Sequence, residues 1–214
     1  MEGIVIVDYE AGNLTSVQRA LNKLHIKSKI TKDSSLIEKA ERIIFPGVGA
    51  AGKAMQVLKK LGIDAALRSA FHKGIPILGI CLGTQIIMER SDEDNTICLG
   101  FIPGEVKRFP EDLRDKDGNK LKVPHMGWNS VHLDRDHVLF KGIDPENEFY
   151  FVHSYYPSPK NKRYIIGETE YGIIFCSVMG INNLFAVQFH PEKSGRPGLK
   201  LLYNFSKWNG EDYA

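Results

Sequence analysis

Short apolar runs alternate with helical patterns through the first part of the chain, and this alternation constrains the fold more than any other feature. Residues 4–8 form a continuous apolar run that ends at a carboxylate, as is typical of a buried parallel strand. Similar runs predict strands over 26–31, 42–45 and 75–80, while helical spacing predicts helices over 14–24, 34–40, 50–72 with a break near Gly62, and 82–89. Because parallel strands need crossover connections, the pattern predicts a mostly parallel open sheet flanked by helices.

The second half of the chain is richer in turns and in short strand patterns. Strands are predicted over 106–109, 128–133, 149–152, 164–170, 173–178 and 184–189, with a hairpin turn at 117–119 and a last helix over 197–208. These segments predict additional antiparallel strands in the C-terminal half of an α/β fold. Since no Gly/Ser-rich or Pro-rich linker divides the 214 residues, we expect one domain over 1–214.

Composition excludes several classes of protein. With 43% hydrophobic and 25% charged residues and a net charge of +2, the chain gives no reason to expect nucleic acid or an anionic membrane as a partner. No apolar run is long enough to span a bilayer, and residues 1–7 do not form a signal peptide. Cys81, Cys98 and Cys176 lack CxxC spacing, so we expect neither a disulfide framework nor a zinc site, and a cytoplasmic protein with reduced thiols.

Cys81 lies where a predicted strand meets a predicted helix, between Gly79 and Gly83. This spacing resembles the nucleophile elbow of hydrolases, with sulfur in place of oxygen. Glycines at these positions allow a sharp turn, and the following helix favours the thiolate. The alternative is a buried cysteine that packs as a small hydrophobe. The elbow spacing favours the nucleophile.

His190 and Glu192 supply the other two groups that acyl transfer needs. Residues two apart in an extended segment point to the same side, and Pro191 stiffens the pair. Glu192 can therefore orient one imidazole nitrogen while the other faces Cys81. Alone, the His-Pro-Glu sequence is typical of a surface turn; together with Cys81 it predicts a nucleophile, a base and an orienting group.

The Pro46-Gly47-Val48-Gly49 loop follows the third predicted strand. Its backbone N–H groups suit a phosphate or half of an oxyanion hole, and a plain glycine loop is the third alternative. Phosphate is the weaker choice because the Lys and Ser/Thr of a P-loop are missing. No metal site is expected, since His125, His132 and His137 lack ligand spacing and the 115–119 segment lacks the glutamate of a calcium loop.

Six segments in order give the chain a resemblance to the class I glutamine amidotransferases, and within them to the glutaminase subunits of imidazole glycerol phosphate synthase. They are DYEAGNL (8–14), PGVG (46–49), GICLGTQ (79–85), PHMGWN (124–129), FVHSY (151–155) and QFHPEK (188–193). The cysteine and histidine segments mark the superfamily, and PGVG, PHMGWN and AGN mark the narrower group. The resemblance covers essentially the whole chain.

The resemblance implies a role for each matching residue. Cys81 would attack the side-chain amide of glutamine, His190 would pass the thiol proton to the departing ammonia, and Glu192 would orient His190. The oxyanion would be held by the N–H of Leu82 and an N–H of the Val48–Gly49 loop, which has to rearrange first. Gln85 and the Ser154–Tyr155 backbone would bind glutamine. No metal or organic cofactor is implied.

The resemblance also implies a partner. The family's glutaminase forms a heterodimer with a cyclase, a (β/α)8 barrel, and ammonia passes through the barrel to react with its nucleotide substrate in histidine biosynthesis. The implied interface residues are Asn13, Trp128, Asn129 and Tyr150. Ala51 and Thr84 stand where the family often has a bulky residue and a methionine, which alters packing near the pocket and leaves the triad intact.

Three competing interpretations remain open from the sequence. The chain could be another amidotransferase subunit, such as that of anthranilate synthase, although PHMGWN and PGVG count against it. It could be a free-standing hydrolase or peptidase with the same cysteine and histidine, active without a partner. It could also be a binding module that kept only the fold, which the intact Cys81, His190 and Glu192 oppose.

Overall fold

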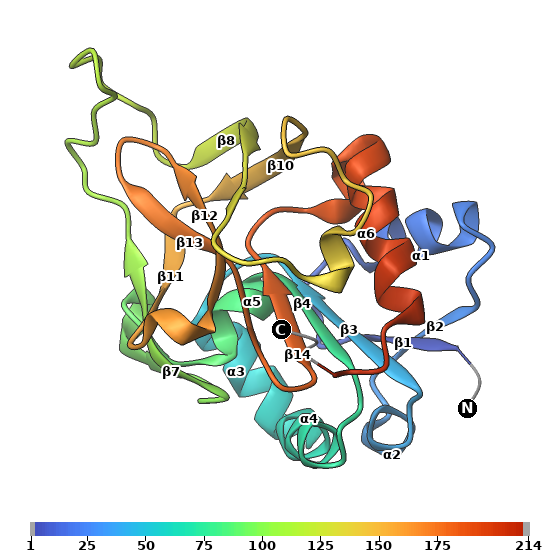
Figure 1. Cartoon of the computed structure of the whole chain (residues 1–214). Coiled ribbons are helices and arrows are strands. Elements are labelled where there is room, and N and C mark those ends of the chain that lie inside the picture. Colours follow the sequence, from blue (N-terminus) through green and yellow to red (C-terminus); the bar gives the residue numbers. More distant parts are fainter. Residues whose placement is uncertain (1–2, 212–214) are drawn as a thin grey trace.

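The computed structural model describes residues 3–211 and is built on a sheet of eight strands in the order β2-β1-β3-β4-β14-β13-β12-β9 (Figure 1). The first five in this order are parallel, and β13, β12 and β9 continue the sheet antiparallel. Their bounds are β1 Ile4–Val7, β2 Ser28–Thr31, β3 Arg42–Gly47, β4 Ile77–Cys81, β9 His132–Leu133, β12 Ile165–Glu170, β13 Ile174–Ile181 and β14 Leu184–Val187. The expected α/β class is confirmed, and the later strands extend the parallel sheet.

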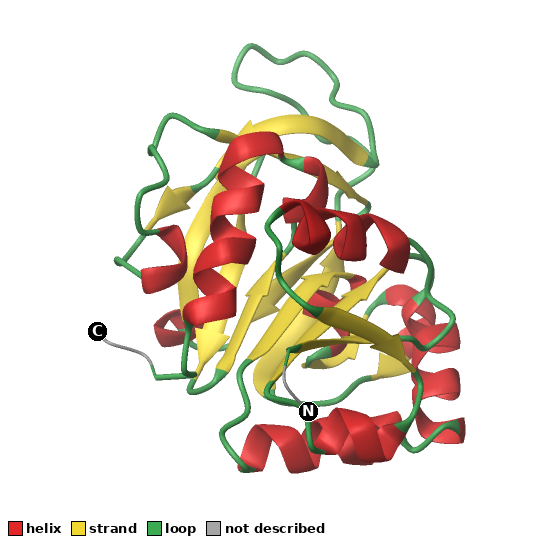
Figure 2. Cartoon of the chain, turned by 90° about the vertical axis from the view of Figure 1, so that its right-hand side faces the viewer, coloured by secondary structure: helices red, strands yellow, loops and turns green. Residues whose placement is uncertain are grey.

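Helices cover both faces of this sheet (Figure 2). They are α1 Leu14–Lys23, α2 Ser34–Glu38, α3 Ala51–Lys60, α4 Ile63–His72, α5 Leu82–Ile86 and α6 Gly195–Lys207. Asp33 caps α2 as its position suggests, accepting hydrogen bonds from the N–H groups of Ser35 and Leu36. Gly62, with φ of 66°, separates α3 from α4 where the break is expected.

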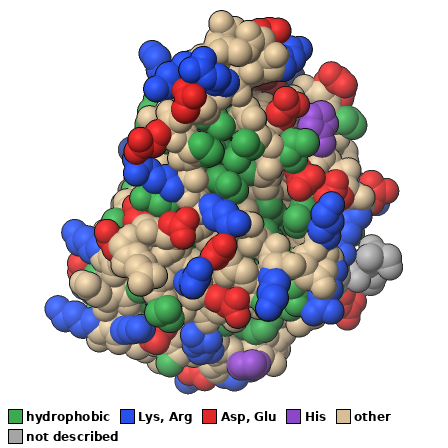
Figure 3. Space-filling model, turned by 90° about the vertical axis from the view of Figure 1, so that its left-hand side faces the viewer, with side chains coloured by type: hydrophobic (Ala, Val, Ile, Leu, Met, Phe, Trp, Pro, Cys, Tyr) green, Lys and Arg blue, Asp and Glu red, His purple; other side chains and the backbone are tan. Residues whose placement is uncertain are grey.

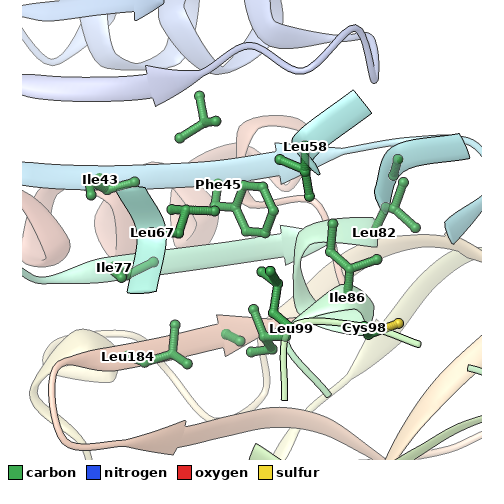
Figure 4. Packing of buried hydrophobic residues seen from close by; sticks show 14 of the residues in the cluster. Ile43, Phe45, Leu58, Leu67, Ile77, Leu82, Ile86, Cys98, Leu99 and Leu184 are labelled. Carbon is green, nitrogen blue, oxygen red and sulfur yellow. The ribbon is translucent and has the colours of Figure 1, made fainter. Parts of the chain in front are cut away.

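The strands of the parallel sheet alternate between two cores. Val5, Ile43 and Phe45 pack against α2, α3, α4 and α5, whereas the intervening side chains pack against α1 and α6. Figure 4 shows the first of these cores, with Phe45 between Leu67 and Leu58. Phe45 is fully buried, so its replacement by alanine would cost about 3–5 kcal/mol. These two cores hold the ends of the parallel strands in fixed positions.

Two smaller sheets lie beside the main one and come mostly from the second half of the chain. One has the order β11-β7-β5-β6 and the other pairs β10 with β8. Their bounds are β5 Met88–Ser91, β6 Thr96–Ile97, β7 Ile102–Arg108, β8 His125–Ser130, β10 Glu148–His153 and β11 Tyr155–Pro159. In Figure 1, β7 and β11 lie to the left of the main sheet, and β8 and β10 lie above it. Residues of β10 and β11 line one side of a cavity at the ends of β3 and β4.

The sequence expectation was wrong at three places in this region. The helix after Cys81 ends at Ile86, and Met88 begins β5, because Met88 pairs in parallel with Ile102 of β7. β11 was missed because its two prolines hide an edge strand that pairs only with β7. The predicted strand over 128–133 is split into β8 and β9, which join different sheets. In each case tertiary pairing overrides the local pattern.

The surface carries charges of both signs. On the face shown in Figure 3, lysine and arginine side chains lie among aspartates and glutamates, with apolar side chains exposed between them. This mixture accords with the net charge of +2. Within residues 3–211, none of the helices has the length and apolar character needed to cross a membrane.

Candidate active site

Cys81 ends β4 and begins α5 with a backbone conformation that side chains rarely adopt. Its φ is 53° and its ψ is −108°, the sharp turn expected of a nucleophile elbow. The glycine requirement has a steric cause: a Cβ on Gly83 would overlap the Phe45 carbonyl oxygen, and one on Gly79 would lie 3.1 Å from the Ala186 Cβ. The neighbouring backbones thus hold the strained turn, and Cys81 itself is only 6% exposed.

β14 brings His190 to the same sheet edge as Cys81. β14 runs parallel to β4, and Val187 pairs with Ile80, so the residues that follow both strands lie next to each other. His190 Nδ1 lies 2.8 Å from Glu192 Oε1, and both side chains are buried. His190 Nε2 has no hydrogen-bond partner within the described chain and is free to serve the sulfur. The structure therefore brings together the three groups that the sequence singled out.

The charges around His190 favour its protonated form. Burial alone lowers the pKa of His190, but the Cys81 sulfur and the Glu192 carboxylate raise it to about 10 overall. A protonated imidazole beside a sulfur is the starting state for thiolate attack, with the proton already on the group that must deliver it to a leaving group. The arrangement suits covalent acyl transfer.

Asn13 contacts the same oxygen of the Glu192 carboxylate that His190 contacts. Its Nδ2 donates to Glu192 Oε1 over 3.2 Å, and its own backbone is left-handed, with φ of 61°, at the N-cap of α1. The sequence predicts Asn13 at a partner interface, and its side chain also contacts the proposed triad.

A cavity of about 330 Å3 opens in front of Cys81. Its wall includes the predicted residues Val48, Gly49, Leu82, Gln85, Ser154 and Tyr155. Leu82 is the first residue of α5, so its N–H has no partner within the helix and is placed beside the sulfur. The cavity is large enough for a side-chain amide substrate of amino-acid size.

The Val48 N–H points away from this cavity. It donates to the Ala11 carbonyl oxygen over 2.8 Å, so it is not available to an oxyanion in this structure. The next residue, Gly49, has φ of 104°, and a Cβ there would meet nothing within 4 Å. Gly47 is more constrained, because a Cβ would overlap the hydroxyl of buried Tyr9. The loop is therefore tightly packed at Gly47, whereas no side chain or backbone crowds it at Gly49.

Gln85 connects the elbow helix to the opposite wall of the cavity. Its Nε2 donates to the Tyr155 carbonyl oxygen over 2.9 Å and to the Gln188 Oε1 over 3.2 Å. Nearby, the buried Thr84 hydroxyl donates to the Val187 carbonyl over 2.6 Å, tying α5 to β14. The polar residue at position 84 is therefore satisfied inside the protein.

Sequence reasoning missed Glu93, which also lines the cavity. It lies in a short 3-10 helix, Glu93–Asn95, and its Oε2 accepts the N–H of Ala51 at the start of α3 over 2.7 Å. No sequence motif surrounds Glu93. It lies at the cavity because it belongs to the connection between β5 and β6. A carboxylate there favours a positively charged ligand group.

The other predicted interface residues gather on β8 and β10. Trp128 pairs with Tyr150 across the two strands, their rings 6.0 Å apart, and Trp128 is 52% exposed. Lys193 Nζ lies 5.6 Å from the Tyr150 ring. Asn129 instead donates to the Glu170 carbonyl over 2.9 Å and is half-buried. Trp128, Tyr150 and Lys193 together form what we call the aromatic rim.

Comparison with known proteins places the chain in a broad context. The profile described as Glutamine amidotransferase class-I matches residues 5–208. The chain is 57% identical to imidazole glycerol phosphate synthase subunit HisH of Maridesulfovibrio salexigens over 205 residues, covering 96% of both proteins. It is 53% identical to the subunit of the same name from Nitratidesulfovibrio vulgaris, again over 96% of both.

Solved structures support the fold. A structure described as a glutamine amidotransferase has a TM-score of 0.69 at 18% identity, covering 95% of this chain and 99% of its own. The glutaminase domain of Trypanosoma brucei CTPS with bound acivicin has a TM-score of 0.62 at 19% identity, covering 99% of this chain and 95% of its own. At these identities the likeness concerns the fold alone.

Proposed function

Because this chain belongs to the class-I glutamine amidotransferase family, we propose that Cys81, His190 and Glu192 are the triad with which it hydrolyses glutamine. The chain is the glutaminase subunit of an imidazole glycerol phosphate synthase and serves histidine biosynthesis. The observation that carries the assignment of the triad is the meeting of the strained Cys81 elbow and the Glu192-held imidazole at one sheet edge.

The chemistry proceeds in two steps. Cys81 Sγ attacks the side-chain amide carbon of glutamine, and His190 gives its proton to the departing nitrogen, which leaves as ammonia. Water then attacks the thioester carbonyl and loses a proton to His190, while the sulfur leaves and glutamate is released. Glu192 keeps Nδ1 engaged through both steps, so that Nε2 does the proton transfer.

The cavity supplies matching contacts for glutamine. The Leu82 N–H and, after the Val48–Gly49 peptide turns, an N–H of that loop would hold the oxyanion. The Glu93 carboxylate suits the α-ammonium group, and Gln85 with the Ser154–Tyr155 backbone would hold the rest of the ligand. We propose no metal or organic cofactor, since the triad and these donors supply the acid, base and nucleophile.

The partner in this proposal is a cyclase subunit with a (β/α)8 barrel, bound as a heterodimer on the aromatic rim. The rim adjoins the triad: the His190 N–H donates to the Tyr150 carbonyl over 2.9 Å, and Lys193 follows Glu192 directly. Met126, which is 62% exposed, lies on the same face of β8 as Trp128. A partner seated there would lie next to the point where ammonia forms.

The remaining parts of the proposal follow from the sequence. Residues 1–214 would act as one amidotransferase domain. The reaction would take place in the cytoplasm, which suits three free cysteines.

Production of imidazole glycerol phosphate by the heterodimer tests this proposal. The wild-type complex should form product from glutamine and also from added ammonium salt. The Cys81→Ala complex should lose the glutamine-dependent reaction and keep the ammonium-dependent one. Glutamine-dependent product at the wild-type rate from the Cys81→Ala complex would contradict the assignment.

A further inference from the structure

Gln188 contacts both the Cys81 sulfur and the Gln85 side chain, and the proposed triad gives it no role. It follows β14 directly, its side chain is fully buried, and its backbone N–H donates to the Ser177 carbonyl over 2.8 Å. Its Nε2 lies 3.8 Å from Cys81 Sγ, within the range of a hydrogen bond to sulfur. Buried polar side chains are normally hydrogen-bonded, so the position of this amide beside a reactive thiol indicates a role for the contact.

The hydrogen-bond chain that contains Gln188 has only one consistent direction. It starts at the Tyr155 carbonyl oxygen, which can only accept, so Gln85 must present its Nε2 there. The same Gln85 nitrogen reaches Gln188 Oε1, which must therefore be the acceptor. Gln188 Nε2 is then left to donate to Cys81. A backbone carbonyl thus fixes the orientation of two side-chain amides.

We propose that Gln188 is a further catalytic residue, whose Nε2–H donates to Cys81 Sγ and stabilises the thiolate that attacks glutamine. The proposal deepens the proposed function and rests on Cys81 being the nucleophile. A hydrogen bond to an ionised acceptor is stronger than a neutral one, and burial strengthens it further. His190 approaches the sulfur with its positive charge, and Gln188 adds a neutral donor that stays in place when His190 gives up its proton.

The physical consequence has a sign that depends on pH. Loss of one such bond disfavours the thiolate about tenfold relative to the thiol, so about tenfold less thiolate is present under conditions in which the thiol predominates. The remaining thiolate is less stabilised and about threefold more nucleophilic, because nucleophilicity follows basicity with a slope of about 0.5. The net result is about threefold slower reaction at low pH and about threefold faster reaction at high pH.

Alkylation of Cys81 by iodoacetamide, followed by peptide mass mapping from pH 5 to pH 10, measures this directly. The full chain would be compared with Gln188→Met, which keeps the volume and removes the donor, and with Gln188→Asn, which shortens the donor out of reach. Thr84→Val is the matched control, because it deletes a buried hydrogen bond to the neighbouring Val187 carbonyl without touching the sulfur. Thermal unfolding of each variant identifies those that fold.

The expected outcome is a crossing of the rate profiles. Both Gln188 variants should react about threefold more slowly than wild type at low pH and about threefold faster at high pH, while Thr84→Val follows wild type. Profiles for folded Gln188 variants that coincide with wild type, or that shift by one factor at every pH, would overturn the proposal. Alkylation needs neither glutamine nor a cyclase, so this result is independent of whether the chain works as a glutaminase.

Discussion

Two buried histidines next to the pocket should make the protein lose stability in mild acid. His153 Nδ1 lies 2.8 Å from the Tyr155 carbonyl, so it donates, and its Nε2 accepts from His125 Nδ1 over 3.1 Å. The remaining nitrogen, His125 Nε2, faces Asn129 Nδ2 at 3.4 Å. With both rings neutral, each ring nitrogen in this row of hydrogen bonds is either a donor or an acceptor and has a matching partner. A proton added to either ring would place two N–H donors opposite each other.

The magnitude follows from the pKa shifts. Burial lowers the pKa of His125 to about 4 and that of His153 to about 3, from an ordinary 6.5. Below pH 6.5 these two histidines therefore bind protons in the unfolded chain but not in the folded chain. The free energy of unfolding consequently falls as the pH falls. Between pH 8 and pH 5 the loss is about 2 kcal/mol for each histidine, or about 4 kcal/mol together. That is a large part of the about 5–15 kcal/mol typical of a domain.

Urea unfolding at pH 8 and pH 5 for wild type and His153→Gln tests this. Glutamine can accept from His125 and donate to the Tyr155 carbonyl without titrating. The variant should lose about 2 kcal/mol less than wild type between the two pH values. His132→Gln is the matched control, since His132 is exposed on β9, and it should follow wild type. Equal losses in wild type and His153→Gln would refute the reasoning.

Three further predictions follow from single sites. Gly83→Ala should fail to fold or unfold at much lower temperature in a thermal melt, because the new Cβ overlaps the Phe45 carbonyl; a melt equal to wild type would contradict the packing. Burial raises the pKa of Cys98 to about 11, so a thiol reagent at pH 8 should modify Cys81 first and Cys98 only after denaturation; fast native labelling of Cys98 would contradict this. Trp128→Ala should weaken cyclase binding at least tenfold by calorimetry with the melting temperature unchanged, and unaltered affinity would remove Trp128 from the interface.

The parallel half of the fold could be predicted because its signal is local. Continuous apolar runs such as Ile4–Val7 and amphipathic segments such as Leu14–Lys23 carry their own period, and Asp33 marks a helix start by its side chain. β5 and β11 could not be predicted in this way. Met88 follows a helix without a break signal, and the prolines of β11 are tolerated only because the strand lies at a sheet edge.

The residues of the candidate site also differ in whether their signal in the sequence is local. Cys81, His190 and Glu192 were found from sequence because each lies in a short motif whose spacing has a mechanical reason. Glu93 was missed, because its place at the cavity depends on how β5 and β6 pair with the rest of their sheet. Gln188 was visible within its motif, but its role depends on a hydrogen-bond direction set by a distant carbonyl.

In the proposed mechanism, a partner would control the reaction through the Val48 N–H. While it donates to the Ala11 carbonyl, the oxyanion hole lacks one donor, and the absence of one donor costs about 100- to 1,000-fold in rate. The isolated chain should therefore be a slow glutaminase, and a partner that turns the Val48–Gly49 peptide should accelerate it by about this factor.

Glutamate release tests the central claim most directly. It would be measured for the chain alone, with a cyclase from the same genome, and with that cyclase and its nucleotide substrate, using Cys81→Ala as the blank. The account predicts slow release alone and a rise of about 100-fold or more only when cyclase and nucleotide are both present. Fast release by the chain alone, or no release from a stable complex with nucleotide, would contradict it.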